Sequence, residues 1–483
     1  MKGTMIQLIS KGSEDTHLTI TPEFSYFKTV YKRHTNFSME SIETIVSSTP
    51  TFGSTKNIKI IREGELLSKV YLEINLPYNT SSNAVWTNRI GFNLIKKVEL
   101  IIGDTIIERQ YGLWMYIWSE LTSTFDKHSL LDHIIGPTSL SGSPSNGLPA
   151  NIPHRLYIPL NFFFCQDYSS SLPIAAILNQ DIFIKIYFQD KNNCFQSGDF
   201  SQISNNINTR VWIDHIFIER SEELKIVQKT HKYLINIPQY YKKNLETSGV
   251  NTVNIPFKLK CKELFWILKT KNISQNTDKF TDFTKGVIQN TPVAQFYQHY
   301  NYGGWKTELR EGSYTSTQLL GLNTDFNSLS SVITNGLTVV LYTGTNFDGN
   351  KIRLVKDNSG LGIYNDKIQS VQIINNNNNN SLLEEAQLKI NSKNLLSSKN
   401  RTYEYFNYIL PYKYHTGYPP LGLNVYPFCL NPEDNNLSGY LNLDNINKFS
   451  LIVKCQKSTI HIFSTSYNIL EIKDNNCILK YKY

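Results

Sequence analysis

The histidines are the first residues to test for chemistry, because a histidine beside a nucleophile can act as a general base and spaced histidines can bind zinc. The chain contains no His-Glu-x-x-His or Gly-x-Ser-x-Gly sequence and no Gly-rich phosphate loop. Asp104 and Glu108 are interpreted as turn and edge-strand residues. Seven histidines lack a partner at the spacing of a triad or a zinc site: His34, His128, His154, His215, His231, His299 and His415. The sequence therefore predicts a protein that is not an enzyme.

A second candidate is the stretch Thr21–Ser41, which combines aromatic side chains with Lys28, Lys32 and Arg33. Clustered cations release counterions when they bind a polyanion, so nucleic acid is one partner to consider. However, three glutamates flank the cations, and the net charge of +8 is small for 483 residues. A solvated or inter-subunit face is therefore favoured, His34 is expected to be a hydrogen-bonded structural residue, and no sequence-specific nucleic-acid binding is expected.

The elements that must position these residues are mainly strands. Short apolar runs recur along the chain, separated by clusters of Gly, Pro, Asn and Ser. Val70, Leu72 and Ile74 alternate as they would in a sheet with one wet face. The best helical candidate is 110–124, and the charged stretch 219–239 is interpreted as a connector with a short helix. The patterns predict an all-β sandwich or jelly roll, with the six scattered cysteines as buried free thiols.

An internal repeat lies between Val293 and Ile374. The sequence "YQHYNYGG" places two aromatics five residues apart, followed by a glycine, and "YTGTNFDG" repeats this spacing. Aromatics at this spacing flank a tight turn, and the glycine supplies a backbone conformation that other residues resist. Each unit ends in a strand that carries a serine, in "FNSLSSVI" and "YNDKIQSVQI". The repeat therefore predicts two similar β units.

This repeat resembles the paired Greek-key motifs of βγ-crystallin domains, whose members often bind calcium through an Asn/Asp-Asn/Asp-x-x-Ser/Thr-Ser stretch in each motif. The resemblance makes four residues candidate calcium ligands: Asn327, Ser330, Asn365 and Asp366. Only one of them is a carboxylate, whereas calcium takes roughly six to eight oxygens, usually with several carboxylates. A metal-free rigid β module is favoured over a calcium site, and no other cofactor is expected.

The rest of the chain resembles the major capsid proteins of nucleocytoplasmic large DNA viruses. The resemblance begins with "GSEDTHLTITPEFSYFKTVYKRHTNFSMES" and continues through "GELLSKVYLEINLP", "VWIDHIFIERSEE" and "CKELFWILK". It extends to the segments 157–177, 230–239 and 405–446. Two local departures are Pro427, where the family has Ser, and Leu437, where it has Pro. The match covers most of the chain outside the repeat.

The resemblance implies a double jelly roll, which is two eight-stranded β-sandwiches in one chain, with the crystallin-like insert in a loop of the second. The implied boundaries are an N-terminal arm 1–24, a first jelly roll 25–220, a connector 221–240 and a second jelly roll 241–483, interrupted by the insert 293–374. Phe24, Phe27 and Tyr31 are expected to anchor the arm beneath the first jelly roll.

The resemblance also implies a structural capsid protein of the virion, assembled in the host cytoplasm. Three chains would form a homotrimeric capsomer with a pseudo-hexagonal outline, which contacts neighbouring capsomers and minor capsid proteins in an icosahedral shell. The insert is expected on the outer surface, where it would meet fibres or host-surface glycans. Two alternatives stay open: an assembly scaffold or minor capsid paralogue, and a host- or glycan-binding protein that acts through the insert.

Overall fold

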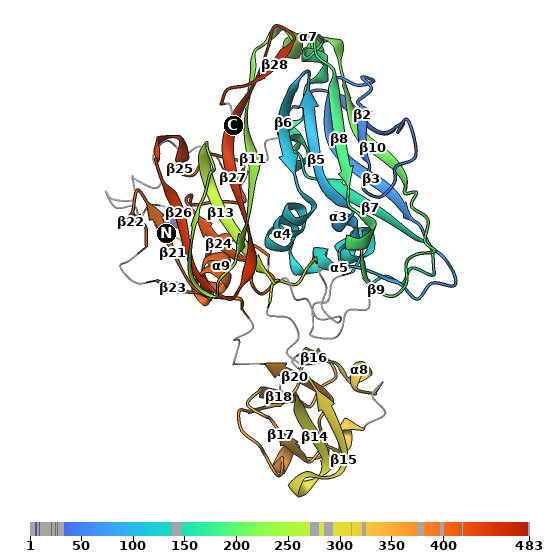
Figure 1. The fold of residues 1–483 in the computed structure, drawn as a ribbon, viewed down its shortest axis with the longest axis vertical. Helices are drawn as coiled ribbons and strands as arrows, with labels where there is room; N and C mark the ends of the chain where they lie inside the picture. The colour runs from blue at the N-terminus through green and yellow to red at the C-terminus, as the bar shows by residue number, and fades with distance from the viewer. Residues whose placement is uncertain are drawn as a thin grey trace.

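The computed structural model describes residues 33–137, 147–270, 280–284, 293–310, 312–320, 325–374, 381–396, 400–417 and 419–481, with a few isolated residues before 33. These residues form two β-sandwiches side by side and a smaller third body (Figure 1). None of the helices in these ranges is long and apolar enough to cross a membrane.

The first sandwich consists of two antiparallel four-stranded sheets. Sheet 1A has the strand order β1-β10-β3-β7, and sheet 1B has the order β2-β8-β5-β6. The strands are Phe37–Thr44 (β1), Thr55–Lys59 (β2), Leu66–Leu76 (β3), Ile95–Ile102 (β5), Thr105–Gln110 (β6), His154–Leu160 (β7), Ile182–Phe188 (β8) and Asn208–Ile218 (β10). Two short strands, β4 (Val85–Trp86) and β9 (Phe195–Ser197), pair beside it. The chain switches between the sheets, and its first and last long strands pair in 1A, as in a jelly roll.

The second sandwich repeats this order strand for strand. Sheet 2A is β11-β27-β13-β24, and sheet 2B is β12-β26-β21-β22. The strands are His231–Leu245 (β11), Gly249–Asn254 (β12), Lys260–Lys269 (β13), Leu383–Ile390 (β21), Lys393–Asn394 (β22), Asn424–Pro427 (β24), Phe449–Cys455 (β26) and Ser458–Lys473 (β27). Three short strands attach to these sheets: β23 (Arg401–Thr402), β25 (Leu441–Asn442) and β28 (Asn476–Leu479). The predicted double jelly roll is confirmed.

The two sandwiches differ in the burial pattern of their equivalent strands β3 and β13. In β3 the alternating residues Val70, Leu72 and Ile74 are buried between sheets 1A and 1B, as predicted. In β13, by contrast, every residue from Cys261 to Leu268 is buried. A strand that is buried on both faces loses the alternating pattern. Sheet 2A is therefore covered on its outer face as well, which the sequence did not predict.

The helices lie mainly in the connections. They are α3 (Ile90–Asn93), α4 (Gly112–Thr122), α5 (Phe125–Ile135), α6 (Phe163–Gln166), α7 (Arg220–Gln228), α8 (Ser316–Leu320) and α9 (Leu410–Tyr414). Helix α4 fulfils the prediction of a helix in 110–124. Helix α7 lies between the sandwiches, but β11 already begins at His231, inside the range 221–240 that the sequence interpreted as a connector. The range 221–240 therefore contains most of helix α7 and the first part of strand β11.

Two of these connections are equivalent. The β6–β7 connection of the first sandwich carries α4 and α5. The β22–β24 connection of the second carries a π-helical segment, Tyr405–Ile409, followed by α9. In Figure 1 α4, α5 and α9 lie toward the lower ends of the sandwiches, while α7 lies at the upper end. The two sandwiches therefore stand side by side with the same polarity.

The third body is the insert between β13 and β21. Its strands are Ala294–His299 (β14), Gly303–Leu309 (β15), Gly312–Tyr314 (β16), Ser331–Ile333 (β17), Thr338–Tyr342 (β18), Lys351–Leu354 (β19) and Ser370–Ile374 (β20). They form the sheets β15-β14-β17 and β16-β20-β18-β19, so the third strand of the first unit pairs into the second unit's sheet. On the two sides of the insert in the sequence, Thr284 and Ser381 form an antiparallel bridge. The two units interlock as one module.

The hydrophobic cores follow the same division. One continuous cluster of buried side chains runs through both sandwiches, from Ile58 to Leu479. A second cluster, from Ala294 to Ile373, belongs to the insert alone. The two jelly rolls are thus packed as a single body, and the insert has its own core.

Candidate functional site

The predicted N-terminal anchor lies largely outside the described residues, including Phe24 and Tyr31. Phe27 is described, and its side chain is 99% exposed. The expected burial of Phe27 beneath the first jelly roll is therefore not found in the single chain. Nearby, the ring Nδ1 of His34 lies 2.8 Å from the carbonyl oxygen of Thr35, and the residue is exposed. Among the described residues, His34 makes a local hydrogen bond to Thr35 and an edge contact with the ring of Phe37.

In the insert, the repeated aromatics and serines occupy equivalent places. Tyr297 and Tyr302 meet edge to face with ring centroids 5.6 Å apart, and Tyr342 and Phe347 do so at 5.9 Å. The hydroxyl of Ser331 accepts a hydrogen bond from the backbone N–H of Tyr302 and donates one to the carbonyl of His299. In the second unit the Ser370 hydroxyl accepts from Phe347 N–H and donates to Gly344. Each serine locks one turn of the module.

The four calcium candidates lie partly together. The N–H of Asp366 donates to the carbonyl of Leu329, which places Asp366 beside the first stretch. Ser330 is buried, whereas Asn327 is exposed. The amide of Asn365 donates to the Asp366 carboxylate at 2.6 Å, and the buried Asn365 Oδ1 has no partner among the described residues. One carboxylate and one free amide oxygen fall short of a calcium ligand set. No group of three or more His, Cys, Asp or Glu side chains suited to a metal occurs in the described ranges.

The best-developed site is the junction between the two jelly rolls, where α4 packs on the outer face of sheet 2A. The ring of Trp114 contacts Phe265 of β13 and Phe463 of β27, with centroids 5.0 and 5.7 Å apart. The ring of Tyr111, just before α4, packs on the ring of Tyr240 of β11, with centroids 4.7 Å apart. Tyr240, Phe463 and Phe265 are direct neighbours across three strands. Helix α4 is therefore an aromatic wedge between the sandwiches.

A buried ionic cluster adjoins this wedge. His415 Nε2 lies 2.8 Å from Glu263 Oε1, and its Nδ1 lies 3.1 Å from Glu433 Oε1. Burial lowers the pKa of His415, but Glu263 and then Glu433 raise it more, to about 9. Both ring nitrogens therefore donate, and the imidazole is charged at neutral pH. The cluster therefore joins three segments: β13 through Glu263, the end of α9 through His415, and the loop that carries Glu433.

The segment after His415 joins the second jelly roll to the end of α4. The N–H of Gly417 donates to the carbonyl of Leu121 at 2.7 Å. The hydroxyl of Thr416 donates to the carbonyl of Thr122 at 3.2 Å. A Cβ at position 417 would lie 2.2 Å from the carbonyl oxygen of Glu120, so only glycine allows this approach. These bonds satisfy carbonyls at the C-terminus of α4.

A second buried charge fixes the base of α4 inside the first jelly roll. The guanidinium of Arg89 is fully buried, bonds Glu120 at 3.3 Å, and also pairs with Asp132. It donates to the carbonyl of Gly136 at 3.2 Å as well. Burial raises the pKa of Glu120 to about 7, against the opposing effect of Arg89. This network ties α3, α4 and α5 into one unit.

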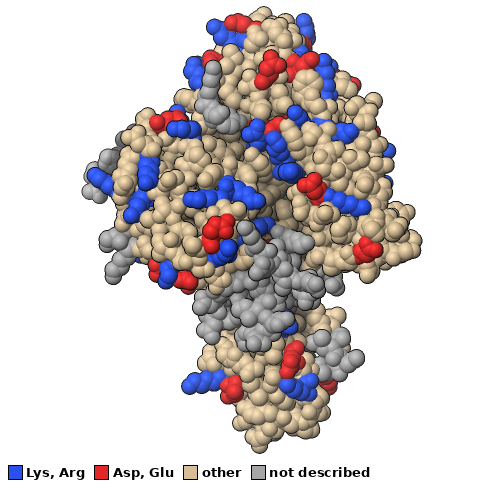
Figure 2. Space-filling view, viewed as in Figure 1, with Lys and Arg blue, Asp and Glu red and all other residues tan. Residues whose placement is uncertain are grey.

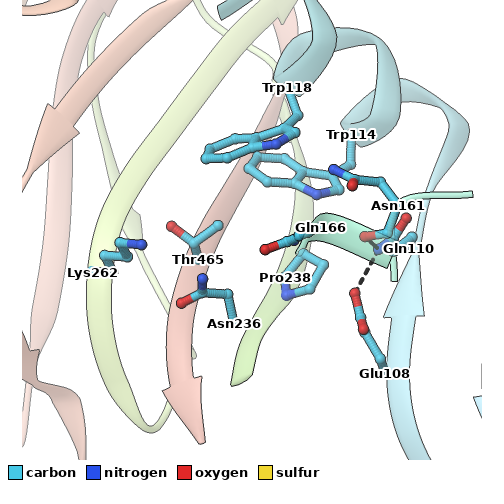
Figure 3. Close-up of a pocket in the computed structure, with 10 residues that line it drawn as sticks. All are labelled: Glu108, Gln110, Trp114, Trp118, Asn161, Gln166, Asn236, Pro238, Lys262 and Thr465. Carbon is cyan, nitrogen blue, oxygen red and sulfur yellow. Dashed lines mark hydrogen bonds between the residues drawn. The ribbon is translucent and has the colours of Figure 1, made fainter. Parts of the chain in front are cut away.

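A small polar pocket of about 20 Å³ lies beside the wedge, between sheets 1B and 2A (Figure 3). Glu108 accepts hydrogen bonds there from Phe163 N–H and Gln110 Nε2, and burial raises its pKa to about 8. Its carboxyl is therefore neutral at pH 7. β6 is indeed an edge strand, as predicted for Glu108, but the second jelly roll covers that edge. The pocket has room for about one water, enough to satisfy the unpaired Gln110 Oε1.

Elsewhere the visible surface is weakly patterned. In Figure 2 basic and acidic side chains are scattered over a largely uncharged face. The six cysteines are buried free thiols, as predicted.

The arrangement that the sequence missed is the cluster around His415, since its partners lie 152 and 18 residues away. The junction is built for rigid attachment.

The comparisons with known proteins agree along the chain. Residues 25–219 match the family "Major capsid protein N-terminus", and residues 222–477 match "Large eukaryotic DNA virus major capsid protein". A major capsid protein of Phaeocystis pouchetii virus is 26% identical over 532 residues, and probable capsid protein 4 of Acanthamoeba polyphaga mimivirus is 29% identical over 523 residues. Each alignment covers 98% of both chains. A structure of the PBCV-1 virus capsid shares the fold, with a TM-score of 0.67 at 19% identity over 95% of this chain and 100% of that chain.

Proposed function

Because the chain belongs to the large eukaryotic DNA virus major capsid protein family, we propose that it is a shell subunit whose three copies form one capsomer. It is a structural capsid protein of the virion. In this proposal three chains form a homotrimer with a pseudo-hexagonal outline. The homotrimer contacts neighbouring capsomers and minor capsid proteins and is assembled in the host cytoplasm.

One observation carries the trimer. Two jelly rolls with the same strand order stand side by side with the same polarity and share one core. A threefold arrangement of such chains presents six similar units around one axis, which suits a hexagonal lattice. The α4 wedge and the His415 cluster support this role, since the two units keep equivalent positions only if their junction is rigid.

The test is imaging of the purified protein together with its mass in solution. Threefold particles with a hexagonal outline and the mass of three chains are expected. Compact monomers at all protein concentrations would contradict the proposal. Copy number in purified virions separates a shell protein, which is abundant, from a scaffold, which is nearly absent.

We propose further that the insert decorates the outer end of the capsomer, where it meets fibres or host glycans. It is supported by a core separate from that of the jelly rolls and by its place on the lower end of the chain, beyond α4 and α5 (Figure 1). A map of the capsid at moderate resolution tests the orientation. Density for the insert on the inner surface of the shell would contradict it.

A further inference from the structure

The outer face of sheet 1A is more aromatic than a wet sheet face should be. Trp212 of β10 and Tyr71 of β3 lie side by side with ring centroids 6.5 Å apart, and Tyr157 of β7 meets Tyr71 edge to face at 6.5 Å. At the edge of the sheet, Phe37 and Met39 are also exposed. Aromatic and methionine side chains are enriched at the cores of protein interfaces.

Two ion pairs on this face already join neighbouring strands of the sheet. The indole N–H of Trp212 donates to Glu73 at 2.9 Å, and Arg155 lies 3.6 Å from the same carboxylate. Arg210 lies 3.7 Å from Glu43. A partner that covers this face would therefore bury few unpaired charges, which keeps the desolvation penalty low.

The same place in the second jelly roll is already covered. Trp212 and Tyr71 are paired across the second and third strands of sheet 1A. Phe463 and Phe265 are paired across the second and third strands of sheet 2A, and α4 covers them. Within one chain, the helix between the sixth and seventh strands of one jelly roll thus packs on the aromatic pair of the next jelly roll.

We propose that this contact is repeated between chains: α9 of one copy packs on the outer face of sheet 1A of a second copy. Helix α9 lies in the β22–β24 connection, the counterpart of the β6–β7 connection that carries α4. Helix α9 carries Tyr412, whose side chain is 90% exposed, and Ile409 at the end of the preceding π-helical segment is half exposed. A free aromatic helix and a free aromatic sheet face are therefore left at equivalent places in one chain.

The geometry of such a contact is heterologous, because one surface meets a different surface of the next copy. A heterologous contact closes into a ring when its rotation divides a full turn. The inference rests on the proposed trimer and deepens it, since three repeats of the contact would alternate with the three internal α4 contacts. Each chain would then offer one acceptor sheet face and one donor helix.

The test places a photo-crosslinking amino acid, p-benzoylphenylalanine, at position 412 of the full chain. Irradiation is expected to give covalent dimers and trimers, with the crosslinks mapped by mass spectrometry to peptides that contain Tyr71, Tyr157 or Trp212. In parallel, Tyr412→Asp is expected to raise the protein concentration needed for half-maximal trimer formation at least about tenfold, as measured by analytical ultracentrifugation. Because the Tyr412 side chain is exposed, we expect the monomer of this variant to fold normally, which circular dichroism checks.

Ile363→Asp is the matched control, because Ile363 is 79% exposed but lies in the insert, away from α9 and sheet 1A. This variant should leave the trimer unchanged. A stable trimer that tolerates Tyr412→Asp and crosslinks to other surfaces would overturn the α9 contact while leaving the trimer in place. A chain that stays monomeric at all concentrations would instead remove the trimer and, with it, this contact.

Discussion

The junction between the jelly rolls and the insert show two ways of adding a folded unit to a chain. At the junction, α4 and the His415 cluster merge two sandwiches into one continuous core. The insert keeps a core of its own. Units that share a core should unfold together, whereas a unit with a separate core should unfold by itself. The comparison separates the contacts that stabilise both jelly rolls from those that stabilise only the insert.

The largest effect should come from removing the wedge. Trp114→Ala deletes a buried indole between α4 and sheet 2A, and it should lower the unfolding free energy of the jelly rolls by about 4 kcal/mol. Hydrogen exchange measured by mass spectrometry should become faster in both jelly rolls and should stay unchanged in the insert. Faster exchange confined to one jelly roll would break the comparison.

The second effect concerns the ionic cluster. His415→Gln removes the cation between Glu263 and Glu433 and should cost about 3 kcal/mol at pH 6. The folded pKa of His415, about 9, lies above the ordinary value near 6.5. Its stabilisation is therefore complete below about pH 6.5 and is lost as the pH rises through about 9.

The measurement is the difference in Tm between wild type and His415→Gln from pH 6 to pH 9.5. Burial also raises the pKa of Glu108 to about 8 and that of Glu120 to about 7, so in both proteins these two carboxyls lose their stabilising contribution as the pH rises from about 4.5 through about 8. The difference isolates the histidine and should shrink toward pH 9.5. A constant difference would show that the histidine acts only by its shape.

Within the insert, Gly304→Ala should give a smaller and local effect. Gly304 has φ 79°, and a Cβ there would lie 2.6 Å from the Cβ of Gln298. We expect about 2 kcal/mol of destabilisation, seen as faster exchange in the insert alone. Gly362→Ala is the control, because its φ of 59° is also left-handed but a Cβ there meets nothing within 4 Å. An equal effect for both would show that strain, without the clash, dominates.

The smallest effect is expected for the turn-locking serines. Ser331→Ala and Ser370→Ala each remove two hydrogen bonds, with an expected loss of about 1 kcal/mol each. Because the two turns are equivalent, the two variants should agree within experimental error. A large inequality in the insert's unfolding midpoint would show that its two halves are not energetically equivalent.

Local signals predicted much of this fold. Alternation around Val70, the helical spacing in 110–124, and the two serines of the repeat all depend on neighbouring residues, so a single sequence contains them. The covered outer face of sheet 2A could not be predicted, because continuous burial in β13 depends on α4, which lies far away along the chain. His415 was dismissed for the same reason, since Glu263 reaches it only in the folded chain.

The candidate sites divide in the same manner. Asn365 and Asp366 became calcium candidates through a local pattern, and the preference for a metal-free module stays a prediction. Glu108 was assigned correctly to an edge strand, yet its neutral carboxyl follows from burial by another sandwich. Phe27 was expected to be an anchor because its stretch resembles the family's N-terminal segment, and that local resemblance does not reveal that its side chain is exposed.

The bridge between Thr284 and Ser381 has an evolutionary consequence. Thr284 and Ser381, which flank the insert, are neighbours, so a foreign gene segment could enter or leave between them without altering the spacing of the flanking strands. Such a position works as a socket for domain acquisition. Viral lineages that compete for hosts would then be able to exchange the insert by recombination while the two jelly rolls stay under separate selection.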